Sequence, residues 1–157
     1  MRVHIATDHA GLELSAHLIE HLGAKGYEMV DHGPTAYDAE DDYPSFCINA
    51  ALAVVADRAA GLDSLGIVLG GSGNGEQIAA NKVAGIRAAL AWNLDTARLA
   101  REHNDANVVA VGGRQHSLEE ATGIIEAFLS EPFSNVERHI RRIGKIATYE
   151  TTGEVVA

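Results

Sequence analysis

The sequence has 157 residues, 46% of them hydrophobic and 22% charged, which is typical of a folded globular protein and excludes a mainly disordered or fibrous chain. We expect a single domain over residues 1–157, because domains usually have about 150 residues. The net charge of −10 makes nucleic acids and anionic membrane surfaces poor partners.

The apolar runs, such as Leu65–Leu69 and Val108–Val111, have the length of strands and are far too short for a transmembrane helix. The N-terminus turns polar at Thr7, so it lacks the apolar region of a secretory signal. The one cysteine, Cys47, cannot form an internal disulfide and lies in the apolar stretch Phe46–Val55, where we expect a buried structural thiol. These features predict a cytoplasmic protein.

Short apolar runs alternate with helical patterns along the whole chain. The runs that predict strands are Val3–Ala6, Tyr27–Val30, Leu65–Leu69, Ala88–Trp92 and Val108–Val111. Helices are expected after each of them, in order around Leu14–Leu22, Phe46–Val55, Gln77–Val83, Leu94–His103 and from Ser117, with a last helix from Ser134. Ser117 and Ser134 each begin an S-x-x-E capping box, in which a serine and a glutamate cap the first turn of a helix.

This alternation predicts an α/β protein with a doubly wound, Rossmann-like, five-stranded parallel sheet and helices on both faces. In such sheets, ligands bind beyond the carboxyl ends of the strands, near the point where the strand order reverses. The residues that directly follow predicted strands are therefore the candidates for a site: Asp8 and His9, Gly70–Glu76, and Gly112–Arg114.

The segment Gly70–Glu76 is rich in glycine and lies between a predicted strand and a predicted helix. Its glycines let backbone N–H groups approach a ligand closely, and the helix N-terminus favours negative charge. Lys82 falls outside the spacing of a Walker A loop, and the glycine spacing differs from a dinucleotide-binding fingerprint. We interpret the segment as a cradle for an oxyanion, with a tight strand-to-helix turn as the alternative.

Two groups of charged residues have both a structural and a functional interpretation. Glu76, in the first turn of that helix, is a charge favoured by the helix dipole, a general base beside the cradle, or both. Arg138, Arg141, Arg142 and Lys145 form either a solvated helix face or a site for a small anion. Arg138 and Arg142 are four residues apart, so on a helix they share a face and are able to bind one phosphate together.

Several motifs, in order along nearly the whole chain, resemble the ribose-5-phosphate isomerase B family. They are Ile5–Gly11 (IATDHAG), Gly66–Glu76 (GIVLGGSGNGE), Ala79–Lys82 (AANK), the pair His103 and Asn104, and Gly112–Arg114 (GGR). The resemblance implies interconversion of ribose 5-phosphate and ribulose 5-phosphate, with no metal and no organic cofactor. It also implies a homodimer or a dimer of dimers, with active sites at the subunit interface. The last helix is then placed to reach the partner subunit.

The chain departs from the family pattern at one position. Many members carry a cysteine base where this sequence has Gly70. A branch of the family places a glutamate at the position of Glu76, so the resemblance assigns the base to Glu76 and not to Cys47.

The resemblance assigns roles to the remaining site residues. His103, helped by Asp8, is the proton donor that opens the sugar ring, and Glu76 moves a proton from C2 to C1 through a cis-enediol. The groups that hold the developing negative oxygen are Ser72 and the backbone of Gly71, Gly73, Asn74 and Gly75. The residues that contact sugar hydroxyls or phosphate are Tyr43, Asn104, His9, Arg114, Arg138 and Arg142. Without the resemblance, His103 also fits an ordinary helix end, and Tyr43 a half-buried aromatic.

Three other functions stay open on the sequence. An isomerase of a six-carbon substrate, such as allose or galactose 6-phosphate, would use the same proton transfer. A non-catalytic sugar-phosphate sensor would keep the cradle without the chemistry, which the presence of Glu76 and His103 disfavours. A flavodoxin-like nucleotide-binding module would bind flavin or nucleotide. The pair His17 and His21 and the acidic run Asp38–Asp42 are interpreted as surface features and not as metal sites.

Overall fold

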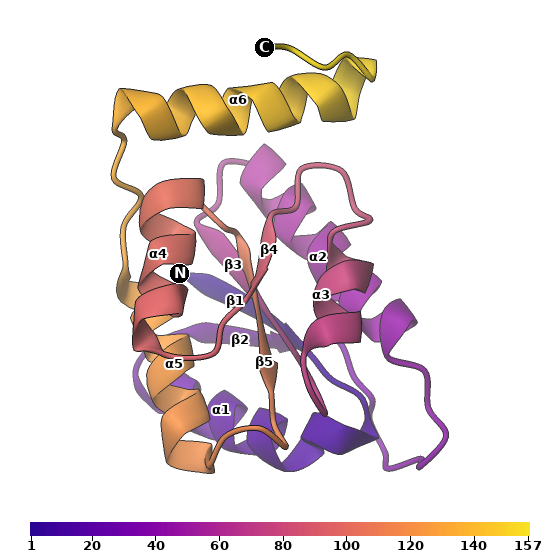
Figure 1. Cartoon of the computed structure of the whole chain (residues 1–157). Coiled ribbons are helices and arrows are strands. Elements are labelled where there is room, and N and C mark those ends of the chain that lie inside the picture. The colour runs from indigo at the N-terminus through magenta and orange to yellow at the C-terminus, as the bar shows by residue number, and fades with distance from the viewer.

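A parallel five-stranded sheet forms the centre of the computed structural model, which describes residues 1–157 (Figure 1). The strands are β1 (Arg2–Ala6), β2 (Glu28–Asp31), β3 (Ser64–Gly70), β4 (Ala88–Leu90) and β5 (Val108–Gly112). Their order in the sheet is β2-β1-β3-β5-β4, so β2 and β3 lie on opposite sides of β1. The strand order therefore reverses between β1 and β3, where open α/β sheets form their ligand-binding crevice.

Helices cover both faces of this sheet. They are α1 (Leu12–Ala24), α2 (Tyr43–Ala59), α3 (Asn74–Ala80), α4 (Leu94–Asn104), α5 (Leu118–Ser130) and α6 (Glu137–Thr152), with a short 3-10 helix, η1 (His9–Gly11), after β1. Helices α1, α4 and α5 pack on one face, and α2 and α3 pack on the other (Figure 1). The predicted doubly wound α/β architecture is thereby confirmed. None of the six α-helices combines the length and the apolar character needed to cross a bilayer.

Each face of the sheet has its own hydrophobic core. Leu18, Leu69 and Phe128 are fully buried on the side of α1 and α5. Cys47 and Val54 are fully buried on the side of α2. Every residue of β3 is buried, because a central parallel strand is covered on both faces. This double cover explains why β3 is an almost continuous apolar run in the sequence.

Helix α3 begins and ends three residues earlier than the sequence predicted, at Asn74–Ala80 instead of Gln77–Val83. Its N-cap is Gly73, whose φ of 81° lies in the left-handed region that glycine adopts without strain. The end of the glycine-rich segment is therefore the first turn of the helix, and Glu76 points from that turn.

The two predicted capping boxes have different outcomes. At α5 the prediction is confirmed: the Glu120 N–H donates to Ser117 Oγ at 3.2 Å, and the Ser117 N–H donates to the Glu120 carboxylate at 2.9 Å. At α6 it is wrong, because the N-cap is Val136 and no side chain caps this end. Ser134 Oγ is hydrogen-bonded instead to His139 Nδ1 at 2.8 Å and accepts from the Val136 N–H at 3.3 Å, so it caps no N–H group of the helix itself.

Helix α6 lies apart from both cores, across the end of the sheet where the strands begin (Figure 1). It packs near the end of α4, where the Ser134 N–H donates to the Glu102 carbonyl at 3.1 Å. Its apolar side chains Ile140, Ile146 and Tyr149 are all more than half exposed. This amphipathic helix therefore has an apolar face that the chain itself does not cover.

Candidate active site

The loops that follow β1, β3 and β5 meet at the carboxyl edge of the sheet. Gly70, the last residue of β3, is paired with Gly112, the last residue of β5. The Gly113 N–H donates to the Gly70 carbonyl at 2.8 Å, and the Arg114 N–H donates to the Gly71 carbonyl at 3.2 Å. The glycine-rich segment and the segment after β5 therefore form one surface at the point where the strand order reverses.

The carboxylate of Glu76 lies against Gly70. A Cβ atom on Gly70 would be 1.9 Å from Glu76 Oε1 and 2.3 Å from its Cδ, far closer than atoms pack. Glu76 is 4% exposed, which is low for a charged residue. Its carboxylate therefore fills the space that a side chain at position 70 would occupy, at the carboxyl end of the central strand.

Burial raises the pKa of Glu76 above the usual glutamate range. The backbone N–H groups of Glu76 itself and of Gly73 act in the opposite direction, and the negative charge of Asp8 adds to the increase. A carboxylate whose pKa is shifted toward neutrality is a stronger base than an exposed one, so Glu76 has the electrostatic setting of a general base.

Close packing explains the glycines that precede Glu76. A Cβ on Gly75 would lie 2.5 Å from the hydroxyl oxygen of Tyr43, which the start of α2 places against the loop. At Gly73 it would lie 2.8 Å from a methyl carbon of Leu90. Side chains at these positions would therefore push the loop away from the sheet or displace Tyr43.

Ser72 and Arg114 complete this part of the surface. Ser72 Oγ accepts from the backbone N–H of Asn74 at 3.3 Å and from its side-chain amide at 3.2 Å, which fixes the turn of the loop. The position of a Cβ on Gly71 is 3.9 Å from Nη1 of Arg114. A guanidinium group therefore lies beside the glycine-rich loop, where it adds positive charge next to the backbone N–H groups.

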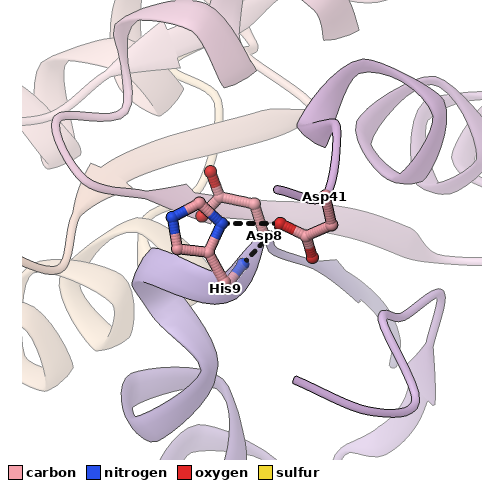
Figure 2. Close-up of side chains that lie close together, drawn as sticks. All are labelled: Asp8, His9 and Asp41. Carbon is pink, nitrogen blue, oxygen red and sulfur yellow. Dashed lines mark hydrogen bonds and ion pairs between the residues drawn. The ribbon is translucent and has the colours of Figure 1, made fainter. Parts of the chain in front are cut away.

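The turn after β1 carries Asp8 and His9 at the same edge (Figure 2). Asp8 caps η1, because its Oδ1 accepts from the Ala10 N–H at 2.9 Å. His9 Nδ1 is 2.7 Å from Oδ1 of Asp41, which lies in the acidic loop before α2. The sequence predicts only a surface loop here and not the contact of Asp41, because no local pattern links Asp41 to a histidine 32 residues earlier.

Asp8, His9 and Asp41 form a group whose ligand atoms all lie within 4.8 Å of one another. This is the arrangement that a metal ion would require. One oxygen of each carboxylate is already engaged, since Asp41 Oδ1 accepts from His9 and Asp8 Oδ1 accepts from Ala10. The hydrogen-bond pattern therefore fits a fixed histidine better than a set of free metal ligands.

The remaining predicted site residues lie at the opposite edge of the sheet. His103 and Asn104 end α4, and the Asn104 carbonyl accepts from Arg87, which directly precedes β4, at 2.8 Å. Arg138 and Arg142 lie on α6, which crosses the same edge (Figure 1). The length of β5 separates the two edges, about 13 Å at 3.3 Å per residue. One chain therefore does not bring the predicted residues together.

This second group has its own organisation around His139. The His139 side chain is buried, its ring centroid lies 4.4 Å from that of His103, and its Nε2 accepts from Arg138 Nε at 3.1 Å. Burial lowers the pKa of His139, as do the positive charges of His103, Arg138 and Arg142. A neutral ring thus holds a candidate proton donor and a candidate phosphate ligand side by side.

Cys47 is buried, as expected for a structural thiol. Burial raises the pKa of its thiol to about 12, with further increases from the charges of Glu76 and Asp8. The thiol therefore stays protonated at neutral pH and does not act as a base.

The sequence model of the family described as Ribose/Galactose Isomerase matches residues 3–146. The chain belongs to this family. Among curated members of the ribose/galactose isomerase family, ribose-5-phosphate isomerase B of Mycobacterium tuberculosis strain H37Rv is 57% identical to it. That match spans 154 residues, 98% of this chain and 93% of the relative. Ribose-5-phosphate isomerase B of Escherichia coli K12 is 38% identical over 149 residues, 95% of this chain and 96% of the relative.

Solved structures of the family have the same fold. The ribose-5-phosphate isomerase B of Clostridium thermocellum gives a TM-score of 0.88 at 40% identity and covers 98% of this chain and 100% of its own. The enzyme of Mycoplasma genitalium with bound ribulose 5-phosphate gives a TM-score of 0.89 at 41% identity, and covers 96% of this chain and 97% of its own. The family and the Rossmann-like fold that the motifs implied are therefore confirmed.

Proposed function

We propose that this protein interconverts ribose 5-phosphate and ribulose 5-phosphate by moving a proton between C2 and C1, without a cofactor. The observation that carries the proposal is the Glu76 carboxylate, which fills the side-chain space at Gly70, beside the glycine-rich loop. Many members of the family carry a cysteine base at the position of Gly70, so in this chain a different residue brings a basic group to the same place. The 57% identity to ribose-5-phosphate isomerase B of M. tuberculosis supports the five-carbon substrate.

The active site of this proposal is composite and requires two copies of the chain. One protomer supplies the carboxyl edge of its sheet: Asp8, His9, Tyr43, Gly71–Glu76 and Arg114. The partner supplies the residues of its opposite edge: His103, Asn104, Arg138 and Arg142 of the partner subunit. In a twofold dimer the carboxyl edge of each protomer meets the opposite edge of its partner, which creates two equal sites. The exposed apolar face of α6 is then buried in the interface.

The reaction begins with the opening of the sugar ring. His103 of the partner subunit donates a proton to the ring oxygen, and the Asp8 carboxylate accepts the proton of the C1 hydroxyl. Asp8 is 8% exposed and adjacent to the β1–β3 crevice, so it faces the substrate in a largely dry setting. The product of this step is the open-chain aldehyde.

Glu76 then carries out the isomerisation. Its carboxylate takes the proton from C2, the electron pair forms the C1–C2 double bond, and the aldehyde oxygen becomes negative. Backbone N–H groups of Gly71 and Gly75, together with the hydroxyl of Ser72, stabilise this oxygen at the N-terminus of α3. Protonation of that oxygen gives the cis-enediol. Return of the Glu76 proton to C1, with loss of the C2 hydroxyl proton, leaves a ketone at C2.

The phosphate is held by cations from both protomers. Arg138 and Arg142 of the partner subunit are one helical turn apart on α6, so their guanidinium groups reach the same group of oxygens. Arg114 and His9 approach from the other protomer. Anchoring at the phosphate leaves the C1 end of the sugar at Glu76, which orients the substrate.

The test is proton NMR of ribose 5-phosphate in deuterated water. Wild type is expected to remove the C2 proton and form ribulose 5-phosphate, while folded Glu76→Gln does neither. Glu20→Gln on α1 is the matched control, because it removes a carboxylate away from the site. If wild type leaves ribose 5-phosphate unchanged but converts allose or galactose 6-phosphate, the protein is a six-carbon isomerase. Binding of sugar phosphates without any conversion would instead identify a sensor.

A further inference from the structure

Asp41 is the one acidic side chain of its loop that is turned inward. Its side chain is only 8% exposed, although it lies in the loop between β2 and α2. Its Oδ1 accepts from the backbone N–H of His9 at 3.1 Å and pairs with His9 Nδ1 at 2.7 Å (Figure 2). Its Oδ2 is buried and has no hydrogen-bond partner.

The burial of this carboxylate requires a compensating partner. An ionised carboxylate removed from water costs several kcal/mol unless a hydrogen bond or an opposite charge offsets the cost. Both hydrogen bonds that Asp41 receives on its side chain come from His9, and its other neighbour in the group, Asp8, carries the same sign of charge. His9 is therefore the partner that compensates the burial of the Asp41 carboxylate.

The contact with Asp41 determines which ring nitrogen of His9 carries hydrogen. Because a carboxylate only accepts, Nδ1 must be the donor, and Nε2 lies on the side of the ring away from Asp41 (Figure 2). A phosphate oxygen at Nε2 also requires a donor there. His9 bound between Asp41 and a phosphate therefore has a proton on both nitrogens, and Asp41 is the counter-ion of the resulting cation.

We propose that Asp41 is a positioning residue, which orients His9 and neutralises its charge so that Nε2 binds the phosphate of the substrate. The inference rests on the proposed function, in which His9 is a phosphate ligand. It adds a requirement for the phosphate group itself, because Asp41 acts only through the phosphate end of the substrate. Replacement of Asp41 therefore weakens substrate binding, whereas the proton transfer at Glu76 is unaffected.

The first test compares Asp41→Asn with Glu40→Gln. Asparagine keeps an oxygen that accepts from His9 but lacks the charge, and Glu40 is an exposed neighbour whose side chain makes no hydrogen bond. Asp41→Asn is expected to raise the KM for ribose 5-phosphate and the inhibition constant of inorganic phosphate about tenfold, with kcat changed less than about twofold. Glu40→Gln is expected to change none of these. An unchanged KM in Asp41→Asn, or a fall in kcat alone, overturns the inference.

A double-mutant cycle separates this role from a purely structural one. In a His9→Ala background, Asp41→Asn is expected to have no further effect on the phosphate inhibition constant, because the group through which it acts is gone. If the tenfold effect persists in that background, Asp41 acts by supporting the loop and the inference is wrong. If wild type does not convert ribose 5-phosphate, calorimetry measures the affinity of wild type and of each variant for inorganic phosphate. The role of Asp41 is then tested even where the proposed function fails.

A measurement on wild type covers the case in which Asp41→Asn does not fold. Nitrogen-15 NMR of histidine-labelled protein, with the His9 signal assigned by its loss in His9→Ala, reports the protonation of each ring nitrogen. We expect hydrogen on Nδ1 in the free protein and on both nitrogens after saturation with inorganic phosphate. Hydrogen on Nε2 alone in the free protein, or a ring that phosphate leaves unchanged, would contradict the assignment.

Discussion

The Glu76 carboxylate occupies the space that a Cβ on Gly70 would need, since such a Cβ would be 1.9 Å from Glu76 Oε1. The two residues come from different elements, the end of β3 and the first turn of α3. The absence of a side chain at position 70 is therefore a condition for the placement of the carboxylate.

Gly70→Ala is expected to displace the Glu76 carboxylate and to lower kcat at least about 100-fold, the usual contribution of a positioned general base. Gly23→Ala on α1 is the matched control, because nothing lies within 4 Å of its Cβ position. Steady-state kinetics with ribose 5-phosphate test the prediction. Near-normal kcat in a folded Gly70→Ala variant would show that the base does not need this contact.

The raised pKa of Glu76 predicts a pH-dependent loss of stability. The folded protein binds this proton more tightly than the unfolded chain, since burial raises the pKa. The contribution of Glu76 to stability is therefore full below the usual glutamate range and is lost as the pH rises through the pKa in the folded protein. Glu76→Gln does not titrate, so it is expected to become more stable relative to wild type as the pH rises from about 4 through neutrality. Urea unfolding across this range measures the difference, and a constant difference would contradict the raised pKa.

Cys47→Ser is expected to leave kcat nearly unchanged while lowering the free energy of unfolding by about 1–3 kcal/mol, because a hydroxyl replaces a thiol in an apolar core. The native thiol is expected to resist iodoacetamide up to about pH 9, given its pKa of about 12. Steady-state kinetics of Cys47→Ser test the first expectation. Thiol labelling of wild type tests the second, and labelling in denaturant is its control. Loss of activity in a folded Cys47→Ser protein would show that the thiol takes part in the reaction.

The proposed composite site predicts complementation between two inactive variants. Glu76→Gln has a defect at the carboxyl edge of the sheet, and His103→Ala has one at the other edge. A mixed dimer carries both defects in one site and none in the other. Unfolding the two variants together and refolding them is expected to restore about a quarter of the wild-type activity, because half of the dimers are mixed and each has one intact site. No recovery would mean that each site is built within one chain.

The exposed face of α6 predicts how the proposed dimer is lost. Ile146→Glu puts a charge on this face and is expected to give monomers with little activity. The fold is expected to survive, because neither core contains a residue of α6. Thr148→Glu, whose position is about 160° around α6 from Ile146 because each residue turns the helix by about 100°, makes the same change in charge and is expected to remain dimeric. Analytical ultracentrifugation with circular dichroism distinguishes these results, and a dimeric Ile146→Glu protein would place the interface elsewhere.

Much of the fold follows from patterns that are local in the sequence. The strands β3 and β5 are buried on both faces, so they appear as unbroken apolar runs that need no further context. The Ser117 capping box was predictable for the same reason, since both of its hydrogen bonds lie within one turn. Ser134 has the same motif but not the same role, because its oxygen is bonded to His139 and to the N–H of Val136, which precedes the helix. The competing partner was not visible in the four-residue motif.

The site was less predictable than the fold, because its contacts join distant parts of the chain. The position of Glu76 after β3 follows from the spacing, but its contact with Gly70 requires the turn at Gly73. The pair of His9 and Asp41 joins two loops that share no pattern. The roles of His103 and Arg138 came from the resemblance, and only the positions of α4 and α6 in the fold show that they lie away from Glu76.

The shared space of Gly70 and Glu76 also constrains how such a site changes during evolution. A cysteine at position 70 and a glutamate at position 76 exclude each other from their native places, so a chain with both has at least one of them displaced. A chain with glycine at 70 and no carboxylate at 76 has no base at this place. An exchange of one base for the other therefore passes through an impaired intermediate, unless both codons change together. This barrier would keep lineages with the two kinds of base apart.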